Sequence, residues 1–123
     1  MPNAHPKTIA VDFDGVIHAY SRGWQDGTIY DPPLPGALDG LRTLMRDHAV
    51  FIHTTRDAKS VAAWLANYGF STALEADTKI EFWNAIGVLL VTDRKLPAVA
   101  YLDDRAVRFT DWKQAITDLT EGA

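Results

Sequence analysis

The sequence contains no cysteine, which excludes disulfide bonds, iron–sulfur clusters and catalysis by a cysteine nucleophile. A structural zinc site is not expected either, because the only histidines are scattered along the chain: His5, His18, His48 and His53. No apolar run approaches the ~20 residues of a membrane-spanning helix, and the polar N-terminus is not followed by a signal-peptide core. We therefore expect a cytoplasmic protein with no membrane partner.

The 123 residues suffice for one domain, which we expect to span residues 1–123. Hydrophobic residues make up 47% of the chain and charged residues 23%, so a packed core is expected. The net charge of −4 disfavours a broad nucleic-acid-binding surface.

The most informative segment is residues 8–15, where an apolar run ends in two aspartates one residue apart. The alternation predicts a buried strand with Asp12 and Asp14 on the same side. Neighbouring carboxylates repel each other unless a cation or a shared proton lies between them, and Gly15 permits a sharp turn. The pattern indicates a hard-metal site with Mg²⁺ as its usual occupant, and a plain Asp-Gly turn is the alternative.

Strand and helix patterns alternate along the rest of the chain. Buried strands are expected at residues 8–13, 49–53 and 98–102, and helices at 37–47, 58–68 and after a cap at 110 or 111. Residues 107–109 form a short apolar piece. The aromatic and β-branched residues of segment 80–92 predict a β-hairpin. The alternation predicts an α/β fold: a doubly wound, mainly parallel, Rossmann-like sheet with helices on both faces.

A long polar connection, residues 16–35, separates the first strand from the first helix. It exceeds an ordinary strand-to-helix loop, and loops of this length tend to be functional. Its Trp24 could stack on a substrate base, close over a site, or pack the loop onto the body; we favour packing. His18 and His53 lie near strand ends, and His53 is interpreted as a packed strand residue rather than a ligand.

Three polar clusters follow three of the predicted strands: Asp12 with Asp14, Thr54 with Thr55, and Asp103 with Asp104. In a parallel sheet the carboxyl ends of the strands share one edge, where ligands bind. The three clusters are therefore expected to converge. This convergence favours a functional site more strongly than any single motif does.

The chain resembles the haloacid dehalogenase superfamily of phosphohydrolases in four segments that follow the family's order. They are residues 12–15 (DFDG), residues 51–56 (FIHTTR), Lys95, and residues 101–105 (YLDDR). The stretch 93–105 is similar to small capless members found in phages and actinobacteria. Because neither the 16–35 connection nor residues 70–95 has room for a folded cap domain, the resemblance implies a capless enzyme with an open site.

The resemblance implies a role for each matching residue. Asp12 would attack phosphorus and form an aspartyl-phosphate, while Asp14 would protonate the leaving oxygen and then activate water. Asp12, the Asp14 backbone carbonyl and Asp103 would hold Mg²⁺, with Asp104 as a supporting or alternative ligand. Thr54 would hydrogen-bond a phosphate oxygen, and a lysine would neutralise the transferring group.

The catalytic lysine is expected to be Lys95, with Lys79 as the alternative; for either, a solvated surface charge is the competing interpretation. Thr55, Arg56 and Gly15 are predicted to contact substrate. Arg56 and Arg105 could equally form ion pairs beside helices.

The expected function is a Mg²⁺-dependent phosphatase acting on a nucleotide, a nucleic-acid end or another small phosphate ester. Two alternatives stay open. One is a receiver-type phospho-acceptor module without enzymatic activity, which would keep a long-lived acyl phosphate. The other is a degenerate member of the fold that serves as an interaction domain. A capless site is also compatible with a homodimer.

Overall fold

The structure is a computed structural model that describes residues 7–75, 80–103, 107–108 and 111–121. Its strands are β1 (Thr8–Asp12), β2 (Ala49–His53), β3 (Thr72–Leu74), β4 (Leu89–Thr92), β5 (Ala100–Asp103) and β6 (Val107–Arg108). Its helices are α1 (Ala37–Met45), α2 (Ala58–Ala66) and α3 (Trp112–Glu121). The predicted elements outside segment 80–92 are confirmed to within about two residues at most ends, whereas β3 and β6 were not predicted as strands.

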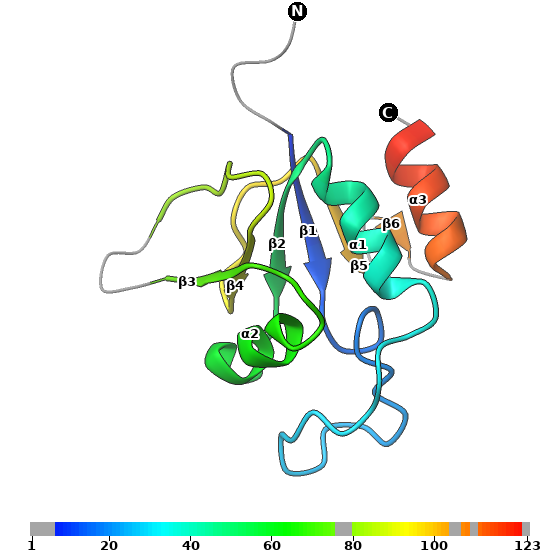
Figure 1. The fold of residues 1–123 in the computed structure, drawn as a ribbon, viewed down its shortest axis with the longest axis vertical. Helices are drawn as coiled ribbons and strands as arrows, with labels where there is room; N and C mark the ends of the chain where they lie inside the picture. Colours follow the sequence, from blue (N-terminus) through cyan, green and yellow to red (C-terminus); the bar gives the residue numbers. More distant parts are fainter. Residues whose placement is uncertain (1–6, 76–79, 104–106, 109–110, 122–123) are drawn as a thin grey trace, which may run out of the picture.

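The strands form one sheet in the order β3-β4-β2-β1-β5-β6, and every neighbouring pair is parallel. Figure 1 shows the strand arrows running side by side, with the 13–36 loop beyond the carboxyl end of β1. The chain moves from β1 to β2 on one side and later returns to β5 on the other. Such a reversal of strand order leaves a crevice at the carboxyl edge of an α/β sheet.

The two faces of the sheet are covered differently. Side chains of all three described helices join one core cluster, together with the strand residues Ile9, Val11, Val50 and Ile52. The opposite face carries Ala10, Phe51 and Leu90, which pack against Leu96 and other residues of the 80–98 segment, where no helix is described. The α/β class and the parallel sheet are thus as predicted, but helices on both faces are wrong for the described residues. None of these helices is long and apolar enough to span a bilayer.

The predicted hairpin at residues 80–92 is also wrong. β4 pairs in parallel with β2 and β3, and residues 80–88 contain no strand. Ile80 and Trp83 instead pack onto the helix-free face, while Phe82 is 56% exposed. The apolar and aromatic content that suggested a strand serves here as an irregular cover for the sheet.

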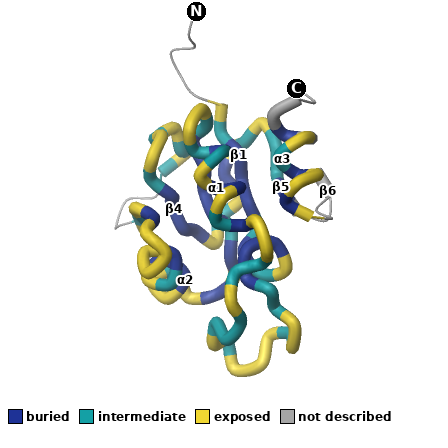
Figure 2. Tube along the Cα trace, turned by 45° about the vertical axis from the view of Figure 1, so that its right-hand side comes forward, coloured by how far each residue is buried: buried dark blue, intermediate teal, exposed yellow. Residues whose placement is uncertain are grey.

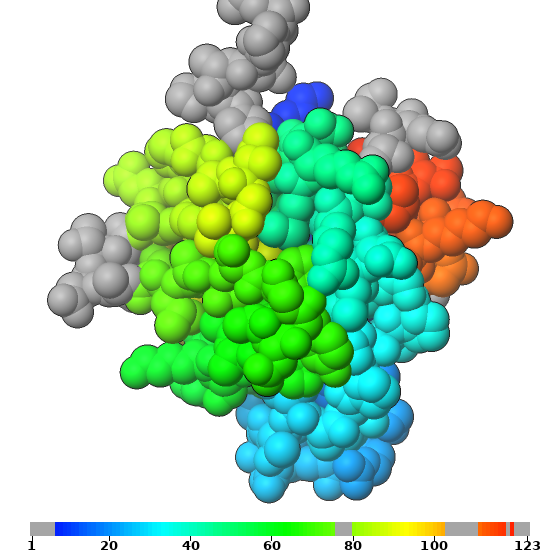
Figure 3. All heavy atoms as spheres, in the orientation of Figure 1, coloured from blue at the N-terminus to red at the C-terminus, as the bar shows by residue number. Residues whose placement is uncertain are grey.

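The long loop, residues 13–36, forms its own small lobe beyond β1. Figure 3 shows it as a blue and cyan protrusion, and Figure 2 shows that its outer part is largely exposed. Gly15 has a φ of 78°, which glycine adopts without strain and which makes the sharp turn predicted after Asp14. The two arms of the loop are joined by hydrogen bonds such as Leu34 N to Ile17 O at 2.8 Å.

Candidate active site

A cleft of about 170 Å³ opens at the carboxyl edge of β1 and β2. Its described lining consists of Asp12, Phe13, Asp14, His53, Thr54 and Thr55. The Asp12 side chain is 37% exposed, so its carboxylate is accessible from the cleft. Two of the three predicted strand-end clusters therefore meet, as the sequence predicts.

Asp12 contacts the neighbouring strand through His53. The two residues are paired in the parallel register of β1 and β2, so their side chains project to the same face of the sheet. The Nδ1 atom of His53 lies 3.3 Å from Oδ1 of Asp12, and the imidazole is 15% exposed. His53 is thus part of the cleft wall beside the Asp12 carboxylate.

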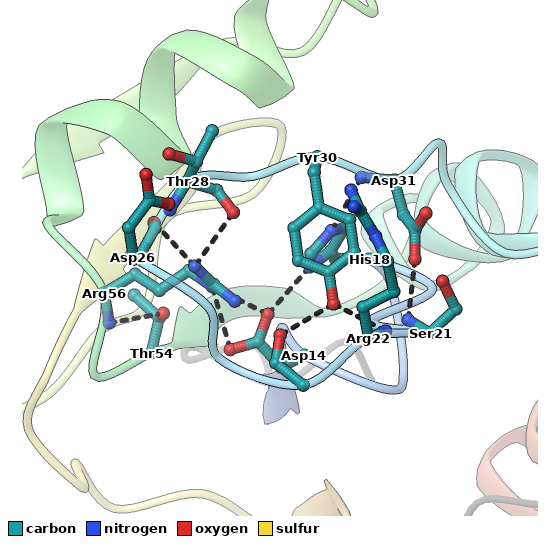
Figure 4. A network of polar contacts seen from close by, with 12 residues as sticks. Asp14, His18, Ser21, Arg22, Asp26, Thr28, Tyr30, Asp31, Thr54 and Arg56 are labelled. Carbon is teal, nitrogen blue, oxygen red and sulfur yellow. Dashed lines mark hydrogen bonds and ion pairs between the residues drawn. The ribbon is translucent and has the colours of Figure 1, made fainter.

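Asp14 is held much more tightly than Asp12. The Nε atom of Arg56 donates to both carboxylate oxygens, at 2.8 and 2.9 Å, and His18 Nδ1 lies 2.9 Å from Oδ1 (Figure 4). The backbone N–H of Asp31 donates to Nε2 of His18 at 3.0 Å, so Nε2 is an acceptor and the ring proton is on Nδ1. The buried, neutral His18 therefore donates to Asp14.

Arg56 joins this carboxylate to the long loop. Its side chain is 1% exposed, and Nη1 donates to the carbonyl oxygens of Gly27 at 2.6 Å and Thr28 at 3.3 Å. The guanidinium also lies 4.5 Å from the ring centre of Trp24. Trp24 is 45% exposed and packs the loop onto this arginine, in agreement with the interpretation we favoured. Arg56 is buried in an ion pair rather than open to the cleft.

Thr54 and Thr55 differ in their surroundings. Thr54 is 4% exposed, its backbone N–H donates to Thr92 O at 3.0 Å, and its hydroxyl oxygen accepts from the Arg56 N–H at 3.0 Å. Thr55 is exposed. Both line the cleft, so a hydroxyl group is available to a ligand there.

The other predicted site residues either do not line the cleft or are described only in part. Lys95 is exposed and is not among the described residues that line the cleft. The backbone of Asp103 ends β5, one position beyond the pair formed by Val11 and Leu102, which puts it beside the end of β1. Asp104, Lys79 and Arg105 lie outside the described residues.

The described donors fit a magnesium ion only in part. Within the described ranges, no three histidine or acidic side chains are close enough to hold a metal. Asp12 is accessible, but the Asp14 carboxylate is bound by Arg56. The assignment of the Asp103 and Asp104 carboxylates to Mg²⁺ therefore rests on the sequence alone.

A second polar network lies at the same edge, at the ends of β3 and β4. Glu75 accepts from Thr92 Oγ1 at 2.6 Å and is paired with Arg94 at 2.5 Å. Burial acts to raise the pKa of Glu75, but the hydrogen bonds from Thr92 and Arg94 outweigh it, so the pKa lies below its usual range. Glu75 therefore belongs to a structural ion pair that stabilises this edge of the sheet.

Sequence reasoning did not anticipate the contacts of His18 and His53. His18 follows Asp14 by four residues across a turn, but only the fold shows that the ring is fully buried against the carboxylate. His53 had a usable signal, because it occupies the last position of β2 just as Asp12 occupies the last position of β1. Comparisons of the chain with protein-family models, curated proteins and solved structures found no match.

Proposed function

We propose that this chain is a Mg²⁺-dependent phosphomonoester hydrolase of the haloacid dehalogenase type, in which Asp12 is the nucleophile. The observation that carries the proposal is the accessible Asp12 carboxylate, which lines a cleft with Thr54 and Thr55 at the carboxyl edge of a parallel sheet. Mg²⁺, when bound, would supply positive charge for the transferring phosphoryl group.

Asp12 suits the role of nucleophile because its carboxylate makes few hydrogen bonds with the described residues. Its described hydrogen bond goes to Oδ1, from His53, so we assign the attack to Oδ2. The lone pair of Oδ2 would form a bond to phosphorus while the ester oxygen leaves with its bonding electrons. Water would then release phosphate from the resulting aspartyl-phosphate.

Asp14 is assigned the proton transfers of this reaction. Its Oδ1 accepts from both Arg56 and His18, whereas Oδ2 accepts from Arg56 alone among the described residues. Each carboxylate oxygen has two lone pairs, so Oδ2 is the oxygen that retains one for a proton. We propose that it protonates the departing ester oxygen and later accepts the proton of the attacking water.

The cleft also bears on the class of substrate. A depression of about 170 Å³ accommodates a phosphoryl group rather than a whole nucleotide, so the rest of the ester would extend into solvent or along the long loop. Such a site suits a nucleotide, a nucleic-acid end or another small phosphate ester.

The test is the turnover of p-nitrophenyl phosphate with and without Mg²⁺. We expect turnover that requires Mg²⁺ and is abolished in Asp12→Asn, because an amide oxygen is a poor nucleophile. The matched control is Asp47→Asn, the same chemical change at an exposed position at the other end of β2, which should keep full activity. Activity that survives Asp12→Asn would exclude the nucleophile assignment. A stable acyl phosphate after acetyl phosphate treatment, without turnover, would favour the receiver-type alternative.

A further inference from the structure

The cleft wall contains one nitrogen-bearing side chain among its described residues, and that side chain is His53. The residue for which a positive charge was predicted, Lys95, is not among them. Asp14 is engaged by Arg56 and His18, and no described hydrogen bond or ion pair joins either of them to Asp12. Among the described residues, the side chain that is hydrogen-bonded to the Asp12 carboxylate is the imidazole of His53, which has no role in the reaction as assigned to Asp12 and Asp14.

We propose that His53 is a catalytic residue of this site, whose Nδ1–H speeds the hydrolysis of the aspartyl-phosphate formed on Asp12. This inference rests on the proposed phosphatase function and assigns a further residue to its second step. It starts from the 3.3 Å contact between Nδ1 and Oδ1.

The contact fixes the protonation of the ring. An ionised carboxylate offers only acceptors, so a hydrogen bond to Asp12 requires the proton on Nδ1. The backbone holds this geometry, because the His53 carbonyl oxygen accepts from Phe13 N at 3.2 Å and His53 is in register with Asp12 on one side and Thr92 on the other. The ring is 15% exposed, so the bond is only partly screened by water.

The charge on Asp12 changes in opposite directions in the two steps. In the first step Oδ2 donates a lone pair to phosphorus, the bond to the ester oxygen breaks, and Oδ1 becomes a nearly neutral carbonyl oxygen. In the second step water attacks phosphorus and gives up a proton, the phosphorus–Oδ2 bond breaks, and its electrons return to the carboxylate. A donor on Oδ1 stabilises this returning charge, so it accelerates the second step and not the first.

The experiment compares His53→Phe with His53→Asn, using p-nitrophenyl phosphate and Mg²⁺. Phenylalanine keeps a ring but has no donor, whereas the asparagine amide nitrogen takes nearly the position of Nδ1. We expect hydrolysis of the phosphoenzyme to slow about 10- to 100-fold in His53→Phe, the usual effect of losing a hydrogen bond to a charged group. One equivalent of nitrophenol should appear in a burst, phosphorylated protein should accumulate in acid-quenched samples by mass spectrometry, and His53→Asn should restore most of the rate.

The control is His48→Phe, the same substitution just before β2, at the end of the strand opposite to His53. Among the described side-chain hydrogen bonds, the His48 ring contacts only Leu44 O, at 3.0 Å. The role of His53 would be overturned if the wild type is active and the His53→Phe variant turns over substrate equally fast without accumulating phosphoenzyme. An inactive wild type would overturn the proposed function instead. NMR of the imidazole nitrogens tests the inference without turnover: a proton on Nδ1 that responds to Asp12→Asn is expected, and an unprotonated Nδ1 would contradict the inference.

Discussion

Replacing Arg56 by methionine tests whether this residue holds the long loop on the sheet. The substitution keeps much of the side-chain length but removes the bidentate contact with Asp14 and the donors to Gly27 and Thr28. It also removes the cation that lies over Trp24. Because the Arg56 side chain is 1% exposed, water cannot replace these contacts unless the loop opens.

The magnitude follows from burial. Removing one partner of a buried ion pair costs about 3–5 kcal/mol, because the remaining charge is left uncompensated. Here Asp14 is 19% exposed, and Nη2 of Arg56 has no partner in the described part of the chain, so both terms reduce the loss. We expect about 3 kcal/mol of lost stability, or roughly 10 °C in Tm for a chain of this length.

The assay is urea denaturation, followed by far-UV circular dichroism, of a double-mutant cycle with Asp14→Asn. If the pair acts as a unit, the double variant should be about 2 kcal/mol more stable than the sum of the single losses predicts. Arg22→Met is the matched control, since Arg22 is an exposed arginine of the same loop stacked 4.3 Å from the ring centre of Tyr30. It should cost no more than about 1 kcal/mol. Equal losses for Arg56→Met and Arg22→Met, with additive behaviour in the cycle, would refute the reasoning.

Two further outcomes are expected. The pKa of Glu75 is lowered in the folded state, so the stability contributed by its hydrogen bonds is present above its ordinary pKa of 4.5 and is lost as the pH falls through the lower folded value. Thermal melts across acidic pH should therefore show a smaller loss of Tm in Glu75→Gln than in the wild type. Identical slopes of Tm against pH would contradict this. Gly40→Ala should lower Tm, because the added methyl group overlaps the buried ring of Trp112 and overpacking costs about 1–3 kcal/mol. This loss opposes the helix propensity of alanine, which exceeds that of glycine by about 1 kcal/mol. An unchanged or higher Tm would show that the ring moves aside.

The sequence predicts most element positions because local patterns determine them. The apolar run before Asp12 and the helical stripe that includes Leu41 and Leu44 each indicate one kind of element. What covers each face of the sheet could not be predicted in this way. Periodicity shows that a strand is buried on both sides, but it does not show which segment packs on each side. Trp83 illustrates the limit: an aromatic residue suits a strand or an irregular segment equally well, and only tertiary packing decides.

The site was predictable to the extent that it depends on strand ends. Parallel strands bring their carboxyl ends together whatever the side chains are, so Asp12 and Thr54 could be grouped from spacing alone. The partners of Asp14 could not be found in this way. Arg56 reaches it from the loop after β2, and His18 reaches it through a turn with a positive φ at Gly15, and neither contact leaves a periodic signal.

The two aspartates of the opening motif therefore differ in what they do for the fold, and this difference is measurable. Asp12 is 37% exposed and makes one side-chain hydrogen bond among the described residues, at 3.3 Å, so Asp12→Asn should change the free energy of unfolding by no more than about 0.5 kcal/mol. Asp14→Asn leaves the buried Arg56 without its counter-charge and should cost about 2–3 kcal/mol. Urea denaturation of both variants without Mg²⁺ makes the comparison free of metal binding. Equal losses would mean that Asp12 is also a structural residue, and the inactivity of Asp12→Asn could then no longer be attributed to a missing nucleophile.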